Sequence, residues 1–175
     1  MGRHAILWAK EGYNVTATDV SPVAVSQTED WAQQEGLTLV AKTAEADAQP
    51  FEDESFDGVL SFGVLYYLPY SRLKSAVSEI LRVLKPGGMA YVMVRSDADS
   101  RCKDAELVDR WTYKVPPLKS GAYWSAEIGM DMIFLDQDAI GECFAGFSEI
   151  VVDRSSITTC NGKFVDDDWL IQLRK

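Results

Sequence analysis

The sequence predicts an α/β fold with an open, mostly parallel and doubly wound sheet. Short runs of β-branched and aromatic residues alternate along the chain with segments of helical apolar spacing, which is the pattern of strands joined by crossover helices. The run from Tyr13 to Thr18 ends abruptly on the carboxylate of Asp19, as expected of a buried strand. Asn161-Gly162 separates the last two expected strands and predicts an antiparallel pair at the carboxyl end of the chain.

Length, charge and cysteine content limit the number of domains and the kinds of partner that we expect. The 175 residues suffice for one domain, 1–175, with a sizeable core. The net charge of −10 would repel a phosphate backbone, so we expect no nucleic acid partner. No apolar run approaches the length of a membrane span, so we expect no membrane partner either. Three cysteines at 102, 143 and 160 share no metal-ligand spacing, which predicts no metal site and a cytoplasmic protein with free thiols.

Four elements are expected in the first fifty residues: a helix over 3–11, a strand over 13–19, a helix over 22–35 and a strand over 37–42. Ile6, Leu7 and Trp8 are expected to face inward from the first helix, and Gly12 is expected to end it. Ser21 is expected to cap the second helix, with Pro22 at its first position, and Gly36 to end it.

The next elements continue the alternation. A strand over 56–62 is apolar enough to be buried on both faces. Ser71 is expected to cap a helix that runs to about Leu84, and the break at 85–88 precedes a strand over 89–94. The pattern then fails from 95 to 134, which we interpret as an insertion under which Met130, Met132 and Phe134 pack. A helix near 136–144 and strands near 148–157 and 169–173 complete the chain.

An acid at the carboxyl end of a parallel strand has a recognisable use. Ligands of open α/β sheets bind beyond the carboxyl ends of the strands, and an acid there accepts hydrogen bonds from a ribose. Asp19 occupies such a position. It also precedes a helix, where a carboxylate is favoured by the helix dipole without any ligand. Both interpretations are kept.

Three segments together carry a family resemblance. They are Gly2-Arg3-His4-Ala5 followed by the stretch 12–21, Asp47-Ala48 followed by Phe51 and 56–61, and Leu81-Arg82-Val83-Leu84-Lys85-Pro86-Gly87-Gly88. In this order and spacing they resemble class I S-adenosylmethionine-dependent methyltransferases, particularly the small bacterial ones that act on small molecules. The expected antiparallel strand pair at the carboxyl end also matches that fold.

The resemblance implies a Rossmann-like methyltransferase sheet and S-adenosylmethionine as cofactor. Asp19 would hold both ribose hydroxyls, and Asp47 with Ala48 would hold the adenine. Gly2 would be the last glycine of the loop that cradles the methionine part. The implied cofactor-binding residues are Gly2, Asp19, Val20, Asp47, Ala48, Ser61 and Phe62. Asp47 as an ordinary loop acid and Phe62 as a core residue remain alternatives.

Aromatic residues supply the expected substrate contacts, and no catalytic base is identified. Tyr66 and Tyr67 follow the strand at 56–62 and suit cofactor or substrate packing, because a phenol is a poor base near neutral pH. Trp111, Tyr123 and Trp124 lie in the insertion, where the family builds its substrate lid. They could equally anchor a loop or a dimer contact. His4 is expected to be an exposed residue at the start of a helix.

The chain departs from the family at its start. Members begin with a strand and a Gly-x-Gly-x-Gly loop, of which only Gly2 is present. We therefore expect an N-terminally truncated domain whose first strand is missing, and a homo-oligomer that exchanges strands across the exposed edges. The leading function is methyl transfer to a small molecule. The alternatives are a non-catalytic remnant that serves as a binding or assembly module, and a nicotinamide-dependent oxidoreductase.

Overall fold

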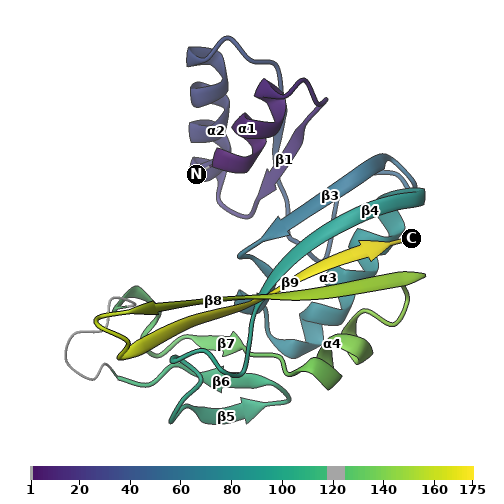
Figure 1. Cartoon of the computed structure of the whole chain (residues 1–175). Helices are drawn as coiled ribbons and strands as arrows, with labels where there is room; N and C mark the ends of the chain where they lie inside the picture. The colour runs from purple at the N-terminus through teal and green to yellow at the C-terminus, as the bar shows by residue number, and fades with distance from the viewer. Residues whose placement is uncertain (1, 118–124) are drawn as a thin grey trace. The chain divides into compact units, whose positions relative to one another are not determined.

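The computed structural model describes residues 2–117 and 125–175 (Figure 1). By its internal contacts the chain divides into two compact units, 1–50 and 51–175, and each is described by itself. The expectation of one domain over 1–175 stays a prediction. In the described part of the chain, no helix is both long and apolar enough to cross a membrane.

The first unit holds two helices and a two-stranded parallel sheet. Its elements are α1 (Arg3–Lys10), β1 (Thr16–Asp19), α2 (Pro22–Gln34) and β2 (Val40–Thr43). β1 and β2 run parallel, with Thr16 opposite Val40 and Asp19 opposite Thr43. The buried residues of this unit are Ile6, Val15, Ala24, Thr28 and Ala32.

Most expectations for this unit are confirmed, and the exceptions include Leu7, the burial of β1 and the starts of the two strands, which begin at Thr16 and Val40 in place of 13 and 37. The Ser21 hydroxyl accepts a hydrogen bond from the Ala24 N–H as the N-cap of α2, with Pro22 in the first turn. Leu7 was expected to face inward but is 51% exposed, whereas Ile6 is buried. β1 was expected to be a buried strand, yet its last two residues are exposed, because it is only four residues long and pairs with β2 alone in its sheet.

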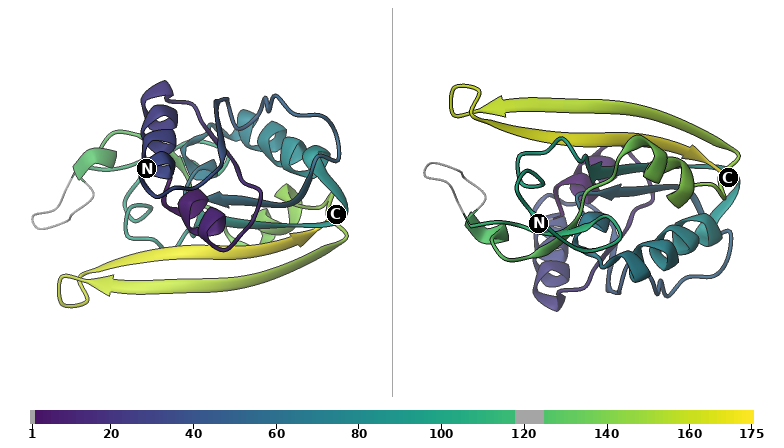
Figure 2. Two further views of the ribbon diagram at one scale, coloured as in Figure 1. Left: turned by 90° about the horizontal axis from the view of Figure 1, so that it is seen from above. Right: turned by 90° about the horizontal axis from the view of Figure 1, so that it is seen from below.

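The second unit is built on a mixed four-stranded sheet with the order β3-β4-β9-β8. Its strands are β3 (Phe56–Phe62), β4 (Leu84–Arg95), β8 (Glu149–Thr159) and β9 (Phe164–Arg174). β3 and β4 are parallel, joined by α3 (Tyr70–Val83). β9 is antiparallel to β4 and to β8. The predicted antiparallel pair is thus confirmed, and it forms the long ribbon in yellow and olive in Figure 2.

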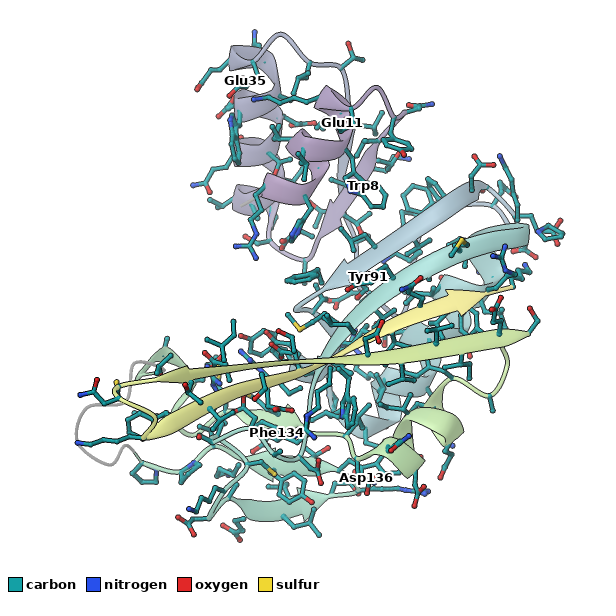
Figure 3. The ribbon with its side chains drawn as sticks, viewed as in Figure 1. Trp8, Glu11, Glu35, Tyr91, Phe134 and Asp136 are labelled. Atoms are coloured by element: carbon teal, nitrogen blue, oxygen red, sulfur yellow. The ribbon has the colours of Figure 1, made fainter. Side chains whose placement is uncertain are left out.

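The core of this unit lies between helices and sheet. α3 buries Leu73, Ala76, Val77, Ile80 and Val83, and the sheet buries Ala90, Val92, Val94, Ile171 and Leu173. Helix α4 (Gln137–Cys143) adds Ala139 and Ile140, and begins at Asp136, whose carboxylate accepts from the Ala139 N–H at 2.7 Å. Phe134 and Asp136 are labelled in Figure 3.

Three expectations about β3, α3 and β4 need correction. Ser71 is not the cap of α3, because the helix already begins at Tyr70 and Pro69 occupies the N-cap position. β3 is not buried on both faces, since Asp57 and Gly58 are exposed. β4 starts at Leu84 and includes the predicted break. The Gly87 N–H donates to the carbonyl of Lys175, and the Lys175 N–H donates to the carbonyl of Gly88.

The stretch 95–134 contains regular structure that the sequence analysis missed. Its strands β5 (Glu106–Asp109), β6 (Thr112–Lys114) and β7 (Asp131–Ile133) form a three-stranded antiparallel sheet. Short 3-10 helices η1 (Leu65–Tyr67) and η2 (Ser125–Glu127) follow β3 and precede β7. Met132 and Phe134 are buried as expected, but Met130 is 46% exposed.

Candidate functional site

The carboxyl end of β1 presents an exposed carboxylate. One oxygen of Asp19, Oδ1, accepts a hydrogen bond from the Ser21 N–H at 2.9 Å, and the Asp19 carbonyl accepts from the Ala44 N–H at 3.0 Å. The side chain is exposed, as is the neighbouring Val20. The Ser21 contact supports a role at the start of α2. The exposed carboxylate retains acceptor capacity for a hydroxyl ligand.

A tight turn follows β2 at the same edge of the two-stranded sheet. Asp19 and Thr43 are paired at the ends of parallel strands, and Glu45 and Ala48 then form an isolated bridge with Asp47 in the turn between them. The Ala48 N–H donates to the Glu45 carbonyl at 3.2 Å. The structure therefore gathers the predicted ribose-binding and adenine-binding residues of this unit at one strand edge.

Gly2 has a packing role at the start of α1. Its φ of 75° lies in the left-handed region, and a Cβ added there would lie 2.6 Å from the Oγ1 of Thr28 on α2. Glycine is therefore required for α1 to approach α2, whatever else this residue does. His4, in the first turn, is half-buried rather than exposed. Burial and the charge of Arg3 lower its imidazole pKa.

The second unit has its own strand edge at the ends of β3 and β4. Phe62 lies opposite Met93 in parallel register, so Ser61, Phe62 and Arg95 come to one edge of the sheet. Tyr66 and Tyr67 follow on η1, with ring centroids 4.5 Å apart. Tyr66 is 5% exposed and Tyr67 is 45% exposed. Both Ser61 and Phe62 are half-buried, so the core alternative for Phe62 stays open.

Arg95, at the end of β4, belongs to a charged cluster that the sequence analysis missed. We define it as Arg95, Asp99, Arg101, Glu127, Asp166 and Asp168. The Arg101 guanidinium contacts Asp99 at 3.0 Å, Asp166 at 2.6 Å and Glu127 at 2.5 Å. Arg95 contacts Asp168 at 3.1 Å. The Tyr67 hydroxyl donates to Glu127 Oε1 at 2.8 Å. The run Asp166-Asp167-Asp168 at the start of an apolar strand was the available signal, because consecutive acids on a buried strand need cations nearby.

The surroundings of the two tyrosines keep them neutral. Burial raises the pKa of Tyr66, although Arg95 opposes this. Burial and the hydrogen bond to Glu127 raise the pKa of Tyr67 further. A phenol in either place is a poor base at neutral pH. Burial also raises the pKa of Asp168, opposed by Arg95 and reinforced by Asp99 and Asp166.

Trp111 lies in a different aromatic group from the two tyrosines. It packs edge-on against Tyr70, with centroids 5.3 Å apart, and the Arg110 guanidinium lies 4.3 Å from the centre of its ring. Its φ of 54° is left-handed. The other predicted lid residues, Tyr123 and Trp124, lie outside the described residues.

The residues at the β1–β2 edge suit the implied cofactor. Asp19 offers an exposed acceptor for ribose hydroxyls, and the turn carrying Asp47 and Ala48 offers a carboxylate and backbone for an adenine amine and ring edge. The donor and acceptor types present therefore fit a nucleoside.

Comparison with known proteins points the same way. A family model described as "Methyltransferase domain" matches residues 1–92. The uncharacterized methyltransferase YodH of Bacillus subtilis is 44% identical over 77 residues, which cover 44% of this chain and 32% of that protein. The chain spans about a third of the length of such curated relatives.

Solved structures share the fold. A SAM-dependent methyltransferase from Methanosarcina mazei aligns with a TM-score of 0.77 at 19% identity, covering 98% of this chain and 86% of that one. The 1,6-didemethyltoxoflavin-N1-methyltransferase of Burkholderia thailandensis, solved with S-adenosylhomocysteine, aligns with a TM-score of 0.68 at 16% identity, covering 99% and 66%. The family match over more than half of the chain confirms the resemblance: this chain belongs to the methyltransferase-domain family of class I S-adenosylmethionine-dependent enzymes.

Proposed function

We propose that this protein transfers the methyl group of S-adenosylmethionine to a small-molecule acceptor. One observation carries the proposal: in a member of this family, the exposed Asp19 carboxylate lies at the same strand edge as the turn that holds Asp47 and Ala48. A small acceptor is supported by the Burkholderia thailandensis neighbour, whose name specifies a small heterocycle as its substrate.

The residues keep the roles that the family pattern suggests. Asp19 holds the ribose hydroxyls and Val20 contacts the adenine side. Asp47 and Ala48 hold the adenine. Gly2 contributes backbone at the amino end of α1, where the N–H groups of the first turn have no partner within the helix. The family pattern also suggests cofactor contacts for Ser61 and Phe62, which belong to the second unit.

The chemistry asks little of the protein beyond orientation. The cofactor supplies a methyl group already activated by its sulfonium. Held by Asp19, Asp47 and Ala48, the cofactor would supply this methyl group to a lone pair of the acceptor, with the bonding electrons left on sulfur, and a proton released by the acceptor would pass to water. Placing the two reactants in line accounts for much of the rate. Tyr66 and Tyr67, which stay neutral, would act as contacts to the acceptor.

The lid residues, the cellular location and the oligomeric state are also proposals. Trp111, Tyr123 and Trp124 would contribute to the substrate lid. The cysteine usage favours a cytoplasmic location, and exposed strand edges favour a homo-oligomer that exchanges strands.

Titration calorimetry with S-adenosylhomocysteine tests cofactor binding. We expect saturable binding in the micromolar range that Asp19→Ala abolishes. Asp30→Ala is the matched control, because Asp30 is an exposed acid on α2 of the same unit, and it should bind like the unaltered chain. Loss of binding in both variants, or none in the unaltered folded chain, would contradict the proposal.

Methyl transfer itself needs a second assay. The chain is incubated with methyl-labelled S-adenosylmethionine and a small-molecule extract of bacterial cells, and labelled products are separated by chromatography. A labelled product that depends on Asp19 supports catalysis. Tight cofactor binding without any product would favour the non-catalytic alternative.

A further inference from the structure

We propose that Glu127 fixes the Tyr67 hydroxyl as a hydrogen-bond acceptor toward the substrate, so that the protein selects methyl acceptors that present an N–H or O–H group. This inference rests on the proposed function and deepens it by naming the substrate class. It is carried by the contacts among Tyr67, Glu127 and Arg101, all within the second unit.

The position of Glu127 is set by a buried cation. Arg101 is 3% exposed, and its Nε donates to Glu127 Oε2 at 2.5 Å, while Nη1 donates to Asp166 at 2.6 Å and to Asp99. Asp99 is itself 1% exposed. A guanidinium shared among three carboxylates cannot turn without breaking charged hydrogen bonds in a poorly solvated place. Glu127 is therefore held in one orientation.

The orientation of Glu127 determines whether the Tyr67 hydroxyl donates or accepts a hydrogen bond toward a ligand. The phenol has one proton, and that proton is donated to Glu127 Oε1 at 2.8 Å. An ionised carboxylate can only accept, so the hydroxyl cannot reverse this bond. The neighbouring Tyr66 hydroxyl also hydrogen-bonds to this oxygen, so it donates to one lone pair, and the lone pair that is left can only accept from a ligand. Tyr67 is 45% exposed, so part of its side chain is open to a ligand.

The charges around Tyr67 act in the same direction. The charged cluster contains two arginines and four carboxylates, and its arginines already contact those carboxylates. A ligand that brings a donor, above all an amine, would meet acceptors there. A ligand that brings a carboxylate would meet like charge. An N–H held by the Tyr67 oxygen also leaves the nitrogen lone pair free for the methyl group.

The test compares two ring systems of similar shape that differ in one atom. Indole offers an N–H donor, and benzofuran offers a ring oxygen in its place. Their binding to the full chain is measured by ligand-observed NMR, with and without saturating S-adenosylhomocysteine. We expect indole to bind at least fivefold more tightly than benzofuran. Tyr67→Phe should bring the ratio close to one.

Two further variants make the result specific. Glu127→Gln should lower the ratio, because a side-chain amide can donate to Tyr67 as well as accept from it. Tyr91→Phe removes a hydroxyl from β4 of the same unit and should leave the ratio unchanged. Equal binding of the two rings to the unaltered chain, absence of binding by both, or a preference that survives in Tyr67→Phe would overturn the inference.

The outcome separates this inference from the proposed function. If S-adenosylhomocysteine binds in calorimetry but indole is not preferred, the donor selection is wrong and cofactor binding stands. If S-adenosylhomocysteine does not bind but the indole preference is present and depends on Tyr67, the polarity of this site stands and the proposed methyl transfer falls.

Discussion

Arg95 and Asp168 face each other across the β4–β9 pair, with the guanidinium Nη1 3.1 Å from the Asp168 carboxylate. Arg95 is only 9% exposed and its Nη1 also lies 3.5 Å from Asp99. Its guanidinium packs over the Tyr66 ring, 5.1 Å from the ring centre. Among the described residues, its buried Nε has no hydrogen-bond partner. The end of the central strand thus carries a charge that only neighbouring carboxylates make tolerable.

Asp167 and Asp168 should change the pH dependence of stability in opposite directions. Burial raises the pKa of Asp168, so its contribution to the free energy of unfolding is present at low pH and is lost as pH rises through the folded-state pKa. Burial alone would also raise the pKa of Asp167, but hydrogen bonds from Arg154, Ser96 and Ser156 lower it on balance. Its contribution is therefore present at neutral pH and lost in acid.

Urea unfolding of the single variants between pH 3 and pH 7 measures this. Asp167→Asn should lower the free energy of unfolding at pH 7 by about 1.5–3 kcal/mol, as for a hydrogen bond to a charged group, and by less at pH 3. The free energy of unfolding of Asp168→Asn should increase relative to that of the unaltered chain as pH rises. Parallel pH profiles for the two variants would contradict the assignment.

Removal of Arg101 should destabilise the protein strongly. Arg101→Met removes the cation of Glu127 and leaves Asp99 with only the longer contact to Arg95, at 3.5 Å, and breaking one side of a buried ion pair costs about 3–5 kcal/mol. Lys114→Met is the control, because Lys114 and Asp131 are both about half exposed and 3.8 Å apart. An exposed pair of this kind contributes about 0–1 kcal/mol. Similar urea midpoints for the two variants would show that Arg101 is not a structural cation.

Most helices and strands were predictable because local signals and tertiary structure agree. The bounds of β3 were predicted without error, and Ser21, Pro22 and Gly36 marked both ends of α2 within one residue. The Asn161-Gly162 turn was equally clear, since both residues adopt the positive φ that such a turn requires. Apolar periodicity and turn chemistry are local properties, so a single sequence reveals them.

The sheet β5-β6-β7 could not be predicted in this way. Its strands are three or four residues long, too short for an alternating pattern to stand out. Ser71 was misleading because a good capping residue stands at the second position of the helix, which already starts at Tyr70. Exposure of β1 and Leu7 depends on which neighbours cover them, which no local pattern encodes.

The candidate site was predictable only for residues that come directly after a predicted strand. Asp19 and the Asp47-Ala48 turn follow β1 and β2, and parallel strands bring their carboxyl ends to one edge. The charged cluster joins the end of β4, the loop that follows it, η2 and β9, and its members Arg95 and Asp168 are 73 positions apart. Its ion pairs form because β4 and β9 are neighbouring strands. The sequence shows these acids and arginines, but it does not show which acid pairs with which arginine.

The contact between Gly2 and Thr28 should appear as coupling in a double-mutant cycle. Gly2→Ala forces a Cβ to 2.6 Å from the Thr28 hydroxyl and keeps a positive φ, so we expect a loss of about 1–3 kcal/mol, typical of overpacking. Thr28→Ala removes the clashing atoms, and the double variant should recover part of that loss. Additive effects in thermal unfolding followed by circular dichroism would contradict a direct contact.

The last prediction concerns the apolar core beneath the sheet. Leu73 on α3 is completely buried, whereas Leu107 on β5 is 61% exposed. Leu73→Ala should therefore cost about 2–5 kcal/mol, the sum of lost apolar burial and the cavity left behind. Leu107→Ala removes the same atoms from a side chain that solvent already reaches, and we expect a change within about 0.5 kcal/mol. Urea unfolding of the two variants under one condition measures the difference. A large cost at Leu107 would mean that another surface covers β5 in solution, and a small cost at Leu73 would contradict the position of α3 against the sheet.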